Sequence, residues 1–150
     1  MAFRFDKTYI LCAIILALAS IRTIAQDIND LRFIGNQTGK SAIGFDEIKD
    51  IYRAKYTLWQ NKLPVIICLP NSQSAEAKEI YERIYSKSIE EVKKFWLAQV
   101  FQGRSRSPQF FNTPEDMISF VSKTPGAIGV LKANASLQIP SVIALQLNSK

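Results

Sequence analysis

The chain has 150 residues, of which 47% are hydrophobic and 21% charged, and this composition is typical of one ordinary globular domain. It contains no histidine, so the commonest general base and the commonest metal ligand are both missing, and we expect no enzyme, no metal site and no cofactor. Its 19 basic and 13 acidic residues are spread along the chain without a basic stripe interleaved with aromatic residues, which argues against a nucleic-acid partner.

The N-terminal segment has the pattern of a secretory signal. Arg4 and Lys7 precede a continuous apolar run over residues 9–21, and small residues follow within the sequence Thr-Ile-Ala that ends at Ala25. The apolar run is shorter than the roughly 20 residues that span a bilayer. We therefore predict that residues 1–25 are a cleaved signal peptide. Residues 26–150 would then form a single exported, periplasmic domain without a transmembrane span. An uncleaved N-terminal anchor and a lipid-modified cysteine are the alternatives.

Hydrophobic periodicity predicts strands that alternate with helices in the rest of the chain. The expected strands lie within residues 30–36, 61–70, 124–131 and 140–147, and the expected helices cover residues 45–55, 75–86, 88–101 and 113–123. The run from Val65 to Leu69 is apolar at every position, which is typical of a strand with both faces covered. We therefore expect this strand at the centre of a sheet with helices on both sides, which makes the fold class α/β.

Two of these helices carry clear start signals. Ser88 and Glu91 have the spacing of a capping box, and Thr113 followed by a proline is typical of an N-cap and a first helical position. Trp96 lies on the apolar face of the helix that follows Ser88, so we predict a core residue rather than a platform for a ligand. Cys68 lies inside the apolar strand and is expected to be a buried free thiol.

The turn Asn-Ser-Gln-Ser at residues 71–74 joins the apolar strand to the next helix, which we expect to begin near Ser74. A helix N-terminus has unpaired N–H groups and a partial positive charge, so this turn is a candidate oxyanion site. The same N–H groups are satisfied equally well if Ser72 or Ser74 is an ordinary N-cap. Glu76 in the first turn would compete with an anion for the helix dipole. Both interpretations remain open on these residues alone.

Two other polar segments are weaker candidates. Residues 35–41 (GNQTGKS) have one residue too few between the glycines for a P-loop, so a polar surface loop is expected. Arg104 and Arg106 lie in a turn and could together clamp an oxyanion, with a solvated loop as the alternative.

Several segments, taken in their order along the chain, resemble the substrate-binding proteins of phosphate ABC transporters, in particular short single-lobe versions. These segments are Ile51-Tyr52 ahead of Trp59, Trp96 followed by FQG, and PGAIG at residues 125–129. The resemblance covers residues 31–131. It implies a three-layer lobe like that of periplasmic binding proteins, with a mixed twisted sheet flanked by helices. It also implies phosphate or a similar oxyanion as the ancestral ligand.

The resemblance also implies which residues hold the ligand. In the family, a Ser-Gly-Thr-like segment between a strand and a helix wraps the anion. Here the corresponding residues are Asn71, Ser72, Gln73 and Ser74, and the glycine is missing. An arginine early in the next helix of the family corresponds to Lys78. The predicted ligand-binding set comprises these five residues together with Arg104 as a further source of charge.

These features imply an exported, non-catalytic, solute-binding-like domain related to phosphate-binding proteins. Because one lobe cannot bury a phosphate by itself, we expect a dissociation constant in the millimolar range or weaker. This corresponds to a binding free energy of roughly −4 kcal/mol or a smaller magnitude. The alternative is a cell-envelope interaction or scaffold domain that has lost ligand binding and has an envelope protein as its partner.

Overall fold

The computed structural model describes residues 30–133, 138–140 and 143–148, and the predicted signal peptide lies outside these ranges. Within them the strands are β1 (Leu31–Gly35), β2 (Ala42–Gly44), β3 (Ile66–Pro70), β4 (Gln109–Phe111), β5 (Ala127–Lys132) and β6 (Ala144–Asn148). The helices are α2 (Phe45–Tyr52), α3 (Ala77–Tyr85), α4 (Ile89–Phe101) and α5 (Pro114–Lys123). Among the described residues, no helix combines the length and the apolar character that crossing a membrane requires.

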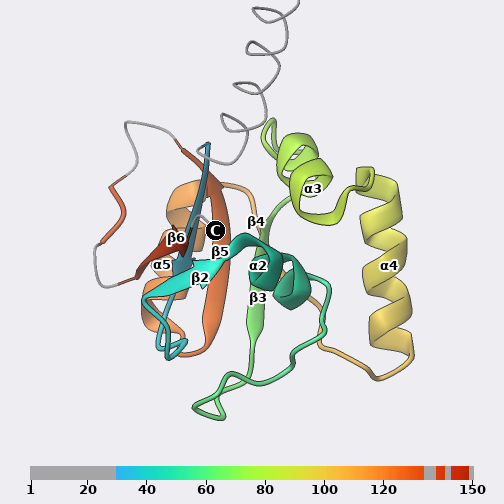
Figure 1. The fold of residues 1–150 in the computed structure, drawn as a ribbon. Coiled ribbons are helices and arrows are strands. Elements are labelled where there is room, and N and C mark those ends of the chain that lie inside the picture. The colour runs from blue at the N-terminus through green and yellow to red at the C-terminus, as the bar shows by residue number, and fades with distance from the viewer. Residues whose placement is uncertain (1–29, 134–137, 141–142, 149–150) are drawn as a thin grey trace, which may run out of the picture. The chain divides into compact units, whose positions relative to one another are not determined.

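The strands of the described ranges form one mixed sheet, in the order β2-β6-β1-β5-β3-β4 (Figure 1). β5 joins its two halves. It pairs antiparallel with β1, where Phe33 lies opposite Val130, and parallel with β3, where Cys68 lies opposite Gly129. β4 extends the parallel half beyond β3. The carboxyl ends of β3, β4 and β5 therefore meet at one edge of the sheet.

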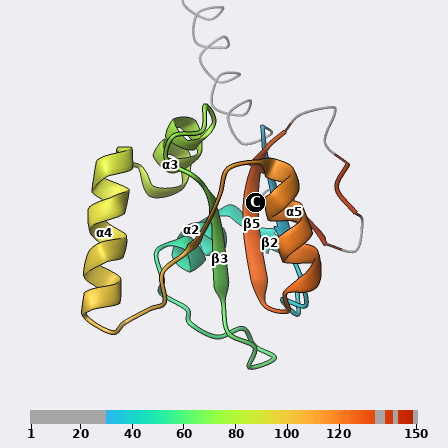
Figure 2. The same cartoon turned by 180° about the vertical axis from the view of Figure 1, so that it is seen from behind.

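Helices cover both faces of this sheet, because side chains of the inner strands alternate between two buried clusters. In β5, Ile128 and Val130 belong to the cluster that also contains residues of α2, α3 and α4. Ala127 and Leu131 belong to the cluster that contains residues of α5. Figures 1 and 2 show α2 in front of one face and α5 in front of the other. The predicted three-layer α/β architecture with a mixed sheet is confirmed.

The predicted central position of the apolar strand is wrong. β1 and β5 occupy the middle of the sheet, and β3 lies next to the outermost strand, β4. β4 has three residues and pairs only with Cys68, Leu69 and Pro70, so the amino-terminal part of β3 has no strand on that side. Cys68 and Leu69 are accordingly fully buried, whereas Val65 and Ile66 are half-buried. The continuous apolar run reflects helices on both faces rather than a central position in the sheet.

The helix start signals are confirmed for α4 and α5. The Ser88 hydroxyl accepts from the Glu91 N–H, and the Glu91 carboxylate accepts from the Ser88 N–H at 2.9 Å, which is the capping box. The Thr113 hydroxyl accepts from the backbone N–H three residues later and caps α5. α3 differs from the prediction, since it begins at Ala77 with Glu76 as its N-cap and no side-chain capping bond.

Candidate functional site

The turn after β3 is held by Asn71, which connects it to the neighbouring strand. The Asn71 N–H donates to the Phe111 carbonyl (2.7 Å), and the Asn71 side-chain amide donates to Asn112 Oδ1 (2.9 Å). Asn71 Oδ1 accepts from the Gln73 N–H (3.2 Å), and the Asn71 carbonyl accepts from the Ser74 N–H (2.9 Å). Three of the four N–H groups in this turn therefore already have acceptors within the domain.

A cavity of about 260 Å³ lies beside this turn, at the carboxyl ends of β3, β4 and β5, and we call it the edge cavity. Its lining comprises Pro70, Ser74, Ala75, Glu76, Phe111, Asn112, Thr113, Pro114, Met117, Val130 and Leu131. Two helix N-termini flank it, that of α3 without a side-chain cap and that of α5 with its threonine cap. The Ser74 hydroxyl oxygen is buried and has no hydrogen-bond partner within the described part of the chain. The Ala77 N–H donates to the Ser74 carbonyl (3.2 Å), so the hydroxyl and the N–H groups that follow Ala77 are the donors that an oxyanion could use.

Acidic groups balance the positive charge around the edge cavity. Glu76 lines the cavity itself, and its carboxylate competes with an anion for the α3 terminus. Lys132, which follows Leu131 at the end of β5, donates to Glu79 Oε2 (2.6 Å), and Arg83 pairs with Glu79 Oε1 (2.5 Å). The hydrogen bond from Lys132, with the charges of both cations, lowers the pKa of Glu79. The ionised Glu79 therefore offsets part of the charge of the two nearby cations.

The predicted ligand residues of the turn do not all line one cavity. Ser74 lines the edge cavity, whereas Asn71 and Ser72 line a neighbouring cavity of about 270 Å³ between α3, α4 and β4. Gln73 and Lys78 are exposed and line neither cavity. The structure thus places five of the six predicted residues around one end of β3, and of these five only Ser74 lines the edge cavity.

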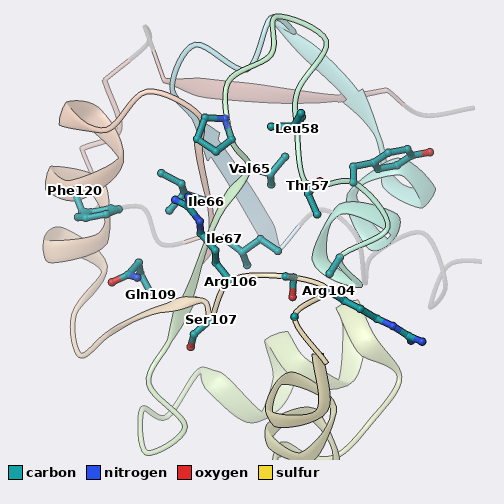
Figure 3. Close-up of a pocket in the computed structure, with 15 residues that line it drawn as sticks. Thr57, Leu58, Val65, Ile66, Ile67, Arg104, Arg106, Ser107, Gln109 and Phe120 are labelled. Carbon is teal, nitrogen blue, oxygen red and sulfur yellow. The ribbon is translucent and has the colours of Figure 1, made fainter. Parts of the chain in front are cut away.

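Arg104, the sixth predicted residue, lies at the other end of β3. It lines a cavity of about 650 Å³, which we call the arginine cavity (Figure 3). The lining comprises Ala54, Tyr56, Thr57, Leu58, Pro64, Val65, Ile66, Ile67, Gly103, Arg104, Ser105, Arg106, Ser107, Gln109 and Phe120. Figure 3 shows Arg106 extending toward Ile66 and Arg104 extending away from the rest of the lining. Arg104 is therefore not positioned to add charge to the edge cavity.

Sequence reasoning considered the two arginines but missed the cavity that they line. Its apolar side is built from Val65, Ile66 and Ile67, which the sequence marks only as a buried strand. The cavity exists because β4 pairs with the carboxyl-terminal part of β3 alone. No residue pattern signals so short a pairing. Within the described ranges, no three cysteine, aspartate or glutamate side chains come together in a way that could hold a metal ion.

Several solved structures share this fold. PstS from Borrelia burgdorferi matches with a TM-score of 0.60 and 18% identity, over 80% of this chain and 47% of that protein. An ABC-type phosphate transport receptor from Vibrio cholerae matches with a TM-score of 0.59 and 13% identity, over 79% of this chain and 46% of the receptor. A putative phosphate ABC transporter substrate-binding protein with bound phosphate, from Clostridium perfringens, matches with a TM-score of 0.58 and 17% identity, over 79% of this chain and 44% of that protein.

The chain therefore spans a little under half the length of the structures that it matches. No protein-family model and no curated protein sequence matches it. The predicted resemblance to phosphate ABC transporter substrate-binding proteins is confirmed at the level of the fold.

Proposed function

We propose that the chain is an exported, non-catalytic domain that binds phosphate or a related oxyanion weakly at the edge cavity. The observation that carries this proposal is the buried Ser74 hydroxyl, which lines a cavity beside an uncapped helix N-terminus. A buried polar group without a partner costs about 1–3 kcal/mol, and a bound oxyanion would remove that cost. The fold likeness to phosphate-binding proteins supports the same ligand class.

Each residue of the proposed site has a distinct role. Ser74 donates its hydroxyl, and the N–H groups of α3 that follow Ala77 donate beside it, since the Ala77 N–H already donates to the Ser74 carbonyl. Lys78 supplies positive charge from the first turn of the same helix. Asn71 holds the turn against β4 through its own hydrogen bonds, and Ser72 and Gln73 complete the turn. These residues bind the anion at a helix N-terminus and do not wrap it completely.

Three features make the proposed binding weak. Most N–H groups of the turn already have protein acceptors. Glu76 places a carboxylate on the same cavity. The described domain spans less than half of the matched structures, and the edge cavity lies open at the edge of its sheet rather than between two domains. Water then competes for the phosphate oxygens and screens the charge.

A phosphate titration followed by amide NMR shifts tests this proposal on the purified protein. We expect shifts in residues 74–79 with a millimolar dissociation constant, which corresponds to roughly −4 kcal/mol. Ser74→Ala should abolish these shifts, and Ser107→Ala, a matched serine from the arginine cavity, should leave them unchanged. Micromolar affinity would show that the site is complete rather than weak. If phosphate concentrations up to about 10 mM, ten times the expected dissociation constant, shift no amide signal, the proposed oxyanion binding is wrong.

The alternative function is an interaction or scaffold domain in the cell envelope, and the exposed face of α4 favours it. Leu97 and Phe101 on this helix keep 59% and 82% of their surface exposed, and Val100 keeps 42%. Such a cluster of apolar side chains on one helix is typical of a contact surface. A photo-cross-linking residue at Phe101 would then capture a defined envelope protein in intact cells, and one at the exposed Ser119 would not.

The exported state has its own test. Mass spectrometry of the mature protein should find Gln26 at its N-terminus, because the sequence before it has the charged start, the short apolar run and the small residues of a cleaved signal. An intact Met1 in the exported protein would contradict this part of the proposal.

A further inference from the structure

We propose that the arginine cavity binds a small organic carboxylate whose body is a hydrocarbon chain or ring. Its volume of about 650 Å³ lies within the roughly 300–1,000 Å³ that is typical of small-molecule sites. It arises because β4 pairs only with the residues from Cys68 to Pro70, so the amino-terminal part of β3 borders a space that no strand fills. This cavity and the edge cavity lie at opposite ends of β3, so neither site depends on the other.

The side of the cavity along β3 is apolar and incompletely buried. Val65 and Ile66 are half-buried although they belong to a continuous apolar run. Leu58 and Tyr56, from the segment before β3, keep 56% and 49% of their surface exposed where they line the cavity. A hydrocarbon group in the cavity would remove this apolar surface from water, which favours binding in proportion to the area covered.

The other side is polar and basic. Residues 104–107 have the sequence Arg-Ser-Arg-Ser, and no acidic side chain lines the cavity. Among the described residues, neither Arg104 nor Arg106 has an ion-pair partner. The Ser105 hydroxyl oxygen is buried and has no hydrogen-bond partner in the same part of the chain. A carboxylate would accept two parallel hydrogen bonds from one guanidinium.

Arg106 is the residue that we assign to the carboxylate. Figure 3 shows its side chain extending toward Ile66, and both residues line the cavity. Arg104 extends away and would act only as a distant positive charge. Inorganic phosphate would gain nothing from the apolar side and would lose hydration there, so an organic acid fits the cavity better.

The test compares three probes that share a ten-carbon chain and differ in charge: decanoate, decanol and decyltrimethylammonium. The two ionic probes are kept below their micelle concentrations, and decanol is kept below its solubility limit. Amide NMR shifts on the purified protein report where each probe binds. We expect decanoate to shift residues 65–67 and 104–107, with a dissociation constant about 10-fold or more below that of either other probe, since a charge-assisted contact is worth at least this factor. Inorganic phosphate should not displace it.

Two arginine variants separate a specific contact from general positive charge. Arg106→Gln should weaken decanoate binding by about 10-fold or more, whereas Arg104→Gln, which removes the same charge, should weaken it by less than about 3-fold. Both side chains are exposed, so both variants should unfold at the temperature of the unchanged protein. Equal affinity for the three probes, an unchanged affinity in Arg106→Gln, or shifts confined to α4 would each overturn the proposal.

Discussion

Gly126 begins the turn into β5, and replacing it with alanine tests how tightly this turn is packed against the chain before β3. Its φ angle is +82°, which is a left-handed conformation, and a Cβ placed there would lie 2.2 Å from the Pro64 carbonyl oxygen. The Gly126 carbonyl also accepts from the Trp59 indole N–H (2.8 Å) and from the Ile66 N–H (3.0 Å). An added methyl group must therefore displace backbone that anchors both β3 and a buried tryptophan.

The expected cost follows from these contacts. A left-handed conformation costs a non-glycine residue about 1 kcal/mol or slightly more. Each weakened hydrogen bond at the Gly126 carbonyl adds about 1 kcal/mol. The displacement of the backbone around Pro64 adds a packing loss of similar size. We therefore expect Gly126→Ala to lower the free energy of unfolding by about 3–5 kcal/mol, a large share of a typical domain's stability.

Two other glycines provide matched controls in urea-unfolding measurements. Gly103 has a φ angle of +64° and nothing within 4 Å of an added Cβ, so its alanine variant should lose about 1 kcal/mol from strain alone. Gly44, the N-cap of α2, has a φ angle of −77° and open space around it, so its variant should lose no more than about 1 kcal/mol, the usual cost of alanine at an N-cap. If Gly126→Ala loses no more than Gly103→Ala, the close packing of this turn is refuted.

Three further predictions rest on buried or paired side chains. Trp96 is 4% exposed and donates its indole N–H to the Tyr85 hydroxyl (3.0 Å), so Trp96→Ala should cost about 3–5 kcal/mol in urea unfolding, and Trp96→Phe only about 1–2 kcal/mol. A loss below about 1 kcal/mol in Trp96→Ala would mean that the ring is not a core anchor. Burial raises the pKa of the Cys68 thiol to about 12, so a thiol reagent at pH 8 should label it only after unfolding. Rapid labelling of the folded protein would contradict this burial. The hydrogen bond from Lys132 lowers the pKa of Glu79, so its stabilising contribution is present above the unfolded-state pKa and is lost as the pH falls through the lower folded-state value. Glu79→Gln should therefore flatten the acid limb of the stability curve, by less than about 1 kcal/mol because the pair is partly exposed, and an unchanged limb would contradict it.

The features that the sequence predicted correctly are those that depend on neighbouring residues. The capping box of Ser88 and Glu91 and the cap at Thr113 place two helix starts, because each signal acts over three residues. The apolar run of β3 correctly predicts helices on both faces of the sheet. The sequence predicts that the helix begins near Ser74, which is too early. Asn71 forms hydrogen bonds with the turn, and α3 begins only at Ala77.

The features that could not be predicted from the sequence depend on strand pairing between residues far apart in the chain. β5 is as buried as β3, and which of them is central follows from their partners rather than from their composition. The short strand β4 pairs with β3 across some forty residues of chain, and its length decides whether the amino-terminal part of β3 is covered. The arginine cavity is a consequence of that length, so it could not be read from the Arg-Ser-Arg-Ser segment by itself.

The two candidate sites lie at the two ends of β3 for different physical reasons. At the carboxyl end, parallel strands lead into α3 and α5, and this topology places both helix N-termini at one edge of the sheet. The fold thus supplies the geometry of the anion site proposed above, whose affinity Glu76 and the occupied N–H groups of the turn would limit. At the amino end, the cavity depends on the length of β4 and on the residues that border it. A ligand bound in the arginine cavity would therefore depend on features specific to this sequence. Millimolar phosphate binding at the edge cavity would depend mainly on the fold.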